Sequence, residues 1–246
     1  MYKIYKMYKI YKILFLLFGF MNLAYASYDD YIDSNNFELN TINTQDSWQN
    51  SLVNKNLYLQ KGNPQKGKEA YIMCAGCHLL SGSGKNDGSF PQLAGQHSSV
   101  IIKQIDDIKN GLRDNPPMYP FAAALTDNQK IIDIATYLEG LCQAADQGKY
   151  TGLDKKDLAE VGKNLYQDNC VECHKDQGQG DALKFYPKLA GQHYGYVLRE
   201  LHLIQKNLRR NGNPDMIKLL QNYNEQQLKS LAVYISELPK IGKLCK

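Results

Sequence analysis

The chain has 246 residues, a formal net charge of +4 and 22% charged side chains. This length suits one large or two small domains. Apart from a short apolar run near its start, no segment is long and apolar enough to cross a membrane, so we expect a soluble mature protein.

The first 26 residues have the pattern of a secretory signal peptide. Lysines at positions 3, 6, 9 and 12 precede a short apolar run from Ile13 to Phe20, and Ala24-Tyr25-Ala26 has the form of a cleavage site. The apolar run is too short for a membrane anchor. Cleavage would remove four lysines and no acid, which brings the formal charge to zero. We therefore predict an exported protein and no nucleic-acid partner.

Charge is unevenly distributed along the remaining chain. Residues 27–60 form an acidic extension with five acids and one lysine, to which the sequence assigns no structure. Residues 155–246 carry fifteen basic and ten acidic side chains, with clusters at Lys155-Lys156 and Arg209-Arg210. This basic excess predicts that a partner docks electrostatically on the second half.

An internal repeat organises the chain beyond residue 60. The run Cys74-Ala75-Gly76-Cys77-His78 recurs 96 residues later as Cys170-Val171-Glu172-Cys173-His174. The run Leu93-Ala94-Gly95-Gln96-His97 recurs at the same offset as Leu189-Ala190-Gly191-Gln192-His193. We therefore predict a first domain over 61–142, a polar linker over 143–154 and a second domain over 155–246.

Each repeat is predicted to be helical, because apolar residues recur at helical spacing and never alternate as in a strand. One helix leads to the first cysteine, a second follows Gln96, and a third spans roughly 127–141 with Thr126 or Asp127 as N-cap. Tyrosines at 71, 137, 166 and 234 are expected where the first and last helices cross. The apolar stripes are Ile101, Ile105, Ile108 and Leu112; Ile131, Ile134, Ala135, Leu138 and Leu141; Val197, Leu201, Ile204 and Leu208; and Leu228, Leu231, Ala232, Ile235 and Leu238.

The C-x-x-C-H runs predict covalent haem attachment. Two thiols three residues apart lie about one helical turn apart on the same side, where they can add to two neighbouring haem vinyl groups. The histidine that follows can bind the iron, and the spacing is the c-type attachment signature. Zinc half-sites or redox dithiols are the alternatives, but they need further ligands or a βαβ context. The predicted residues are Cys74, Cys77 and His78 in the first half and Cys170, Cys173 and His174 in the second.

The second axial ligand of each iron is predicted to be a methionine. Met118 lies 40 residues after His78, and Met216 lies 42 residues after His174. Both stand among helix breakers between the middle and last helices, so we expect ligating loops rather than core filling. His97 and His193 compete for this role, but their place at a helix start favours capping or a surface position.

These motifs together resemble the dihaem cytochromes c4. The resemblance covers roughly residues 61–241, and the Leu-Ala-Gly-Gln run makes it more specific than C-x-x-C-H alone. It implies an all-α fold of two tandem class I cytochrome c-like domains, related by approximate two-fold symmetry, with the haem propionates near their interface. It also implies that the carbonyls of Pro91 and Pro187 orient the iron-binding histidines through their ring N–H groups.

The resemblance implies a function as well. It predicts a periplasmic electron carrier that works between respiratory-chain partners, such as a membrane cytochrome complex and a terminal oxidase. Peripheral membrane association and a monomeric or dimeric state belong to the same expectation. The alternatives are a dihaem peroxidase or a cytochrome subunit of an oxidase or dehydrogenase complex. A peroxidase needs an open iron position, whereas each half here offers a methionine.

Two further cysteines lie outside the haem motifs. Cys142 and Cys245 each follow the last helix of their own domain, and export permits disulfide formation. We predict a disulfide that ties the two domain ends together. Two free thiols, or a bond to another chain, remain the alternatives.

Overall fold

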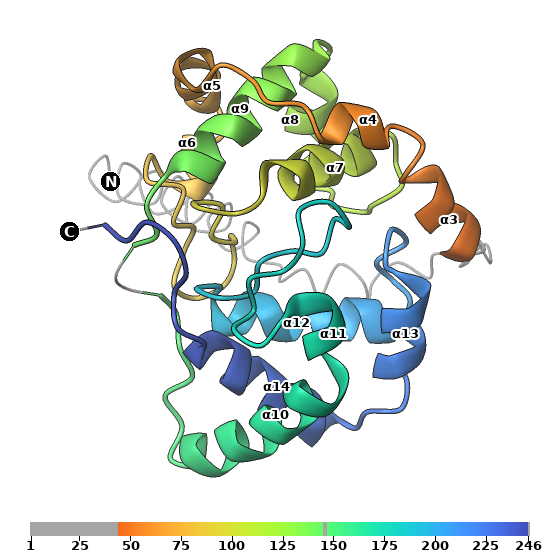
Figure 1. Cartoon of the computed structure of the whole chain (residues 1–246), viewed down its shortest axis with the longest axis vertical. Helices are drawn as coiled ribbons and strands as arrows, with labels where there is room; N and C mark the ends of the chain where they lie inside the picture. The colour runs from red at the N-terminus through yellow and green to blue at the C-terminus, as the bar shows by residue number, and fades with distance from the viewer. Residues whose placement is uncertain (1–43, 145–146, 246) are drawn as a thin grey trace, which may run out of the picture. The chain divides into compact units, whose positions relative to one another are not determined.

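Helices account for the regular secondary structure of the described residues, 44–144 and 147–245, in the computed structural model (Figure 1). Two isolated bridges, Gln143 with Leu244 and Asp181 with Tyr186, are the only strand-like pairings among them. The all-α prediction is thus confirmed for this part of the chain. The predicted signal peptide lies outside the described residues. No helix within the described part is long and apolar enough to cross a bilayer.

The three helices predicted for each half are present, and two short helices accompany them in each. Helix α5 begins at a proline behind the N-cap Asn63, and Asp127 rather than Thr126 caps α9 by accepting from the N–H of Gln129. The first half contains α5 (Pro64–Tyr71), α6 (Ala75–His78), α7 (Ser98–Lys109), α8 (Tyr119–Ala124) and α9 (Asn128–Gly140). The second half contains α10 (Lys155–Asn169), α11 (Val171–His174), α12 (Tyr194–Gln205), α13 (Pro214–Leu220) and α14 (Glu225–Glu237).

The first and last helices of each half cross closely at a glycine. A Cβ on Gly67 would lie 2.0 Å from the carbonyl oxygen of Asp133, and one on Gly162 would lie 2.0 Å from that of Ser230. Only glycine allows α5 to meet α9, and α10 to meet α14, at this distance. The predicted tyrosine pairs pack beside the crossings, with ring centroids 5.7 Å apart for Tyr71 and Tyr137 and 5.4 Å apart for Tyr166 and Tyr234.

Each half has its own apolar core, and the predicted stripes supply most of it. Leu112 and Leu208 are only half-buried, because α7 ends at Lys109 and α12 at Gln205, so these two residues leave the helical face. Phe185 of the second half is buried in the core of the first half, where its ring stands edge-on to Tyr58 at 5.6 Å. The two domains therefore share apolar contacts.

The described part of the acidic extension folds onto the first domain. It contains α3 (Thr44–Asn50) and α4 (Lys55–Tyr58), and α4 packs on α7. The Tyr58 hydroxyl donates to Asp106 Oδ2 at 2.7 Å, and the Ser51 hydroxyl donates to Asp107 Oδ2 at 3.0 Å. Burial of these carboxylates requires such partners, which explains why this segment is ordered against α7.

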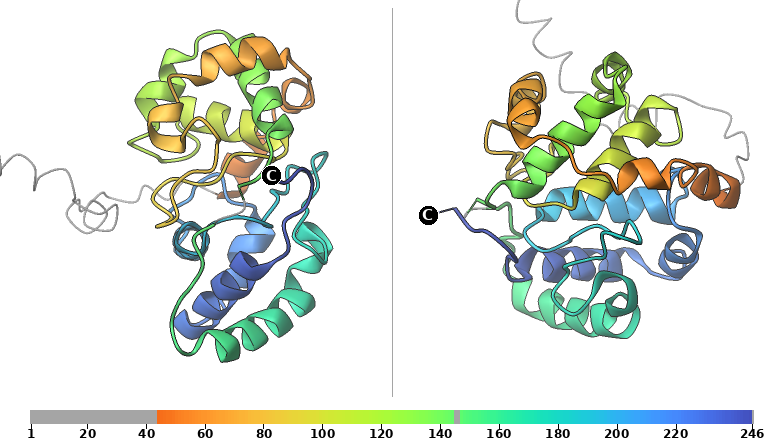
Figure 2. Two further views of the ribbon diagram at one scale, coloured as in Figure 1. Left: turned by 90° about the vertical axis from the view of Figure 1, so that its left-hand side faces the viewer. Right: turned by 45° about the horizontal axis from the view of Figure 1, so that its top comes forward.

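Helices α7 and α12 form the middle of the described unit, between the outer pairs α5/α9 and α10/α14 (Figures 1 and 2). Charged side chains link them. The carboxylate of Glu200 on α12 accepts from Arg113 at 3.1 Å and from Arg209 at 2.8 Å, and Gln104 on α7 accepts from both arginines. Arg210 pairs with Asp114 of the first half.

Arg209 and Arg210, which were predicted to dock a partner, both form ion pairs within the chain. Their charges are used inside the contact between the two domains, where carboxylates of both halves neutralise them. Lys155 of the other predicted cluster pairs with Glu237 at 2.7 Å. A count of charges along the chain does not show which of them meet a partner within the fold.

The described residues of the predicted linker, 143–144 and 147–154, form hydrogen bonds with both the C-terminal segment and the second domain. Gln143 is 2% exposed, and its main chain bonds to Lys243 and Cys245 near the C-terminus. The N–H of Gly148 donates to His193 Nδ1 at 2.9 Å, and the carbonyl of the same glycine accepts from the N–H of Tyr194 at 2.7 Å. Polar side chains of the linker also form buried hydrogen bonds, since Gln143 donates to the carbonyl of Ala190 and Gln147 donates to that of Ser236.

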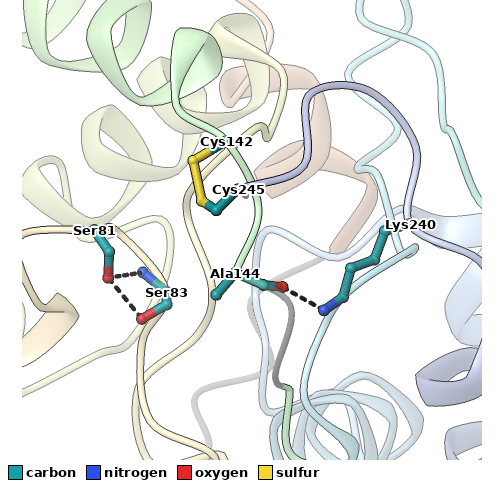
Figure 3. Close-up of a disulfide and its surroundings, with 6 residues drawn as sticks. All are labelled: Ser81, Ser83, Cys142, Ala144, Lys240 and Cys245. Carbon is teal, nitrogen blue, oxygen red and sulfur yellow. Dashed lines mark hydrogen bonds between the residues drawn. A yellow bond between two sulfur atoms is a disulfide. The ribbon is translucent and has the colours of Figure 1, made fainter.

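The predicted disulfide between Cys142 and Cys245 is confirmed (Figure 3). Their Cα atoms lie 5.0 Å apart, and 103 positions separate them in the chain. The Lys240 ammonium donates to the carbonyl of Ala144 close by (Figure 3). The bond joins the end of the first domain to the end of the second, so it closes a loop that contains the whole second half.

Replacement of both cysteines by serine is expected to lower the free energy of unfolding by about 2–4 kcal/mol. The disulfide restricts the unfolded chain over a long loop, and its loss restores that conformational freedom. Denaturant titration of the variant and the parent, each with its haem complement verified, measures the difference. In reducing buffer the parent should approach the variant. Equal midpoints under oxidising conditions would show that the bond has no net stabilising effect.

Candidate haem-binding sites

Each C-x-x-C-H run forms a short helical turn after the first long helix of its half. Cys74 precedes α6, and Cys170 precedes α11. The four motif cysteines are free of disulfides and partly buried. Burial raises the pKa of the Cys74 thiol to about 11 and that of Cys170 to about 12, so both stay protonated at neutral pH. Both also pack against the apolar core of their own half.

The chain turns sharply after the histidine of each motif. Leu79 and Lys175 take positive φ values of 62° and 65°, a backbone conformation that residues other than glycine rarely adopt. The hydroxyl of Tyr71 donates to the carbonyl of Leu79 at 2.9 Å, and that of Tyr166 donates to the carbonyl of Lys175 at 2.8 Å. These tyrosines thus hold the turn as well as packing the crossing. The sequence predicted only the packing role. The signal for the second role was that a tyrosine stands shortly before the first cysteine in both halves, by three residues in one and four in the other.

The imidazoles of His78 and His174 are buried, and each is held by a proline carbonyl. Nδ1 of His78 lies 3.3 Å from the carbonyl oxygen of Pro91, and Nδ1 of His174 lies 3.2 Å from that of Pro187. Burial lowers the pKa of both histidines, although the hydrogen bond acts in the opposite direction. Both rings are therefore neutral at pH 7, with Nδ1 as donor and Nε2 left as a ligating atom.

The two methionines occupy matching positions, Met118 in a turn as expected and Met216 inside a short helix. Met118 immediately precedes α8, and Met216 is the third residue of α13. In each case an asparagine three residues earlier accepts from the methionine N–H at 3.2 Å: Asn115 in the first half and Asn213 in the second. Both side chains are partly buried against the core of their own half. The prolines that suggested loops instead lie in or next to these short helices, because a helix's first turn tolerates proline.

The side chains of His97 and His193 neither cap a helix nor lie free on the surface. Each stands at a helix N-cap without a side-chain capping bond, and His193 is fully buried. Nε2 of His97 lies 2.7 Å from the carbonyl of Gln179, and Nε2 of His193 lies 2.7 Å from the carbonyl of Ser83. Each ring thus bonds to the glycine-rich loop of the opposite half. The repeat signalled their importance, but the partner loops could be found only in the folded chain.

The donor set in each half fits haem c. It comprises two cysteine thiols on one helical turn, a neutral buried imidazole with its Nδ1 occupied, and a methionine packed on the apolar core of that half. Within the described residues, no group of three or more His, Cys, Asp or Glu side chains is placed to hold a metal ion directly. The zinc alternative therefore finds no support in the geometry.

Comparison with known proteins gives the same class. The cytochrome c family model matches residues 64–141 and again residues 159–239. A cytochrome c4 of Thiocapsa roseopersicina is 32% identical over 190 residues, which cover 73% of this chain and 94% of that one. A thiosulfate dehydrogenase electron acceptor of Stutzerimonas stutzeri is 32% identical over 193 residues, covering 74% and 84%. The crystal structure of reduced recombinant cytochrome c4 from Pseudomonas stutzeri superimposes with a TM-score of 0.64 at 26% identity, covering 72% of this chain and 99% of that one.

The chain therefore belongs to the cytochrome c family, with one family domain in each half. Within that family it groups with the dihaem cytochromes c4, and its cofactors are two covalently bound haem c groups. It is a dihaem electron carrier similar to the cytochromes c4.

Proposed function

We propose that the protein is a dihaem electron carrier of the periplasm, with no catalytic centre of its own. The donors in each half carry this proposal: each half has a buried motif histidine and a methionine packed on its apolar core. Haem c supplies reversible one-electron chemistry at iron when it is bound. With both axial positions filled, neither iron would offer a site for peroxide, which favours a carrier over a peroxidase.

The residues have defined roles in this proposal. Cys74 and Cys77 would form the thioether bonds of the first haem, and His78 and Met118 would be its axial ligands. In the second half the thioethers would come from Cys170 and Cys173, with His174 and Met216 as axial ligands. Iron ligation by histidine together with the sulfur of a methionine would give a high reduction potential, as suits electron delivery towards an oxidase.

The partners are proposed to be redox proteins of a respiratory chain. A membrane cytochrome complex would supply electrons, and a terminal oxidase would receive them. The Stutzerimonas relative suggests a second class of donor, since it is a thiosulfate dehydrogenase electron acceptor. The N-terminal pattern of residues 1–26 supports export to the periplasm.

Purified mature protein tests the proposal directly. Its intact mass should exceed that of the polypeptide by two haems, and acid–acetone should not extract them. Redox titration should show two electrons taken up reversibly per chain, without rapid peroxide turnover. A carrier is ruled out if one haem or none is attached, or if peroxide is consumed as fast as an enzyme would consume it.

A further inference from the structure

The glutamine of each Leu-Ala-Gly-Gln-His run clamps the main chain of the opposite domain. Oε1 of Gln192 accepts from the N–H of Gln92 at 2.9 Å, and its Nε2 donates to the carbonyl of Gln92 at 3.0 Å. The other clamp is its counterpart: Oε1 of Gln96 accepts from the N–H of Lys188 at 2.8 Å, and its Nε2 donates to the carbonyl of Lys188 at 2.9 Å. The four bonds form two reciprocal pairs across the domain contact.

Each clamp acts on a peptide group that also bonds to an iron-binding histidine. The carbonyl of Pro91 and the N–H of Gln92 belong to one planar amide. That carbonyl accepts from His78 Nδ1, while the N–H donates to Gln192 of the second domain. A single amide therefore connects the axial imidazole of the first half to a side chain of the second.

The second half repeats this connection in the opposite sense. The carbonyl of Pro187 and the N–H of Lys188 form one amide. Its carbonyl accepts from His174 Nδ1 at 3.2 Å, and its N–H donates to Gln96 of the first domain. The two relays thus run in opposite directions through the interface.

We propose that Gln192 and Gln96 are positioning residues that tune the haem of the opposite domain. The idea rests on the proposed function and deepens it. Each glutamine strengthens the hydrogen bond between a proline carbonyl and an iron-binding histidine of the opposite domain. It thereby lowers the reduction potential of the haem attached to that opposite domain.

The physical basis is polarisation of the shared amide. When the N–H of an amide donates, its carbonyl becomes a stronger acceptor, and such chains strengthen each bond by about 10–30%. A stronger bond at Nδ1 makes the imidazole a better electron donor, which favours oxidised iron. In the clamp on the first domain, Gln92 and Gln192 are only 4% and 8% exposed, so water does not readily replace it, whereas Gln96 and Lys188 of the other clamp are half-buried.

Separate replacement of the two glutamines by leucine tests the proposal. Gln192→Leu should raise the midpoint potential of the haem attached to the first domain and leave the second unchanged. Gln96→Leu should do the reverse. We expect a change of about twofold to threefold in the reduction equilibrium, or about 18–28 mV at 59 mV per tenfold. The NMR signal of the corresponding histidine Nδ1–H should move upfield in the reduced protein, because its hydrogen bond is weaker.

A matched control separates the relay from general loosening of the interface. The Ser99 hydroxyl donates to the carbonyl of Ala182 across the same contact at 2.7 Å, without touching either relay. Ser99→Ala should leave both potentials and both Nδ1–H signals in place. If a leucine variant does not fold, the shorter Gln192→Asn or Gln96→Asn withdraws the clamp while it retains a polar side chain.

The outcomes are distinct. A shift confined to the haem of the opposite domain supports the relay. Four results overturn the relay while the proposed function stands. These are a shift of the midpoint potential for the haem of the variant's own domain, an equal shift for both haems, the same shift in Ser99→Ala, and no shift at all. Absence of the haems themselves would instead remove the proposed function on which the relay rests.

Discussion

Met118→Ala and Met216→Ala are each expected to remove about half of the weak far-red absorption that marks a thioether-to-iron bond in the oxidised protein. Each methionine would serve one iron only, because each packs on the core of its own half. The double variant should lose the band completely. Each single variant should also lower one midpoint potential and open one iron to small ligands such as peroxide.

Met73→Ala is the matched control. Met73 stands directly before Cys74 with an exposed side chain, so it cannot reach the opposite face of the haem. Its replacement should leave the band and both potentials unchanged. An intact band in Met118→Ala or Met216→Ala would mean that another residue binds that iron, and the ligand assignment for that half would have to be abandoned.

Glu200→Gln is expected to lower the free energy of unfolding by about 3–5 kcal/mol at pH 7. The carboxylate lies between Arg113 of the first half and Arg209 of the second, at 3.1 and 2.8 Å. Glutamine keeps the size of the side chain but removes its charge. The buried Arg113 and the partly buried Arg209 would then lose the carboxylate that lies between them, so the contact between α7 and α12 should weaken.

The effect should depend on pH in a defined direction. Burial by itself would raise the pKa of Glu200, but the charges of Arg113, Arg209 and Arg199 outweigh it and hold that pKa below its usual range. A carboxyl whose pKa is lowered by folding stabilises the protein above its unfolded pKa, about 4.3, and loses this contribution as pH falls through the lower folded value. Parent and variant should therefore differ fully at pH 7 and converge in strong acid.

The same substitution at an exposed ion pair provides the control. Glu225 pairs with His202, but its side chain is 74% exposed. Glu225→Gln should cost less than about 1 kcal/mol. Denaturant titrations of both variants at several pH values measure the comparison. A loss for Glu200→Gln no larger than for Glu225→Gln would show that the buried cluster adds nothing to the stability of the domain contact.

The features that the sequence predicts well depend on short-range chemistry. The C-x-x-C-H spacing sets thiols and imidazole on one helical turn wherever the turn lies. The helical stripes fix which faces are buried, and the 96-residue repeat requires that both halves fold alike. The disulfide between Cys142 and Cys245 could be predicted because each cysteine follows the last helix of its own repeat and neither belongs to a haem motif.

Contacts between the two repeats were decided only by the tertiary structure. Arg209 looks like a docking charge in the sequence, yet it bonds to Glu200 and Gln104 inside the domain contact. Gln96 and Gln192 stand out only as repeated letters, and His97 and His193 as spare ligands or caps. Periodicity records which face of a helix is buried, but not which residue of a distant segment will meet it. The orientation of one domain on the other makes that choice, because every buried polar group at the contact must find its partner there.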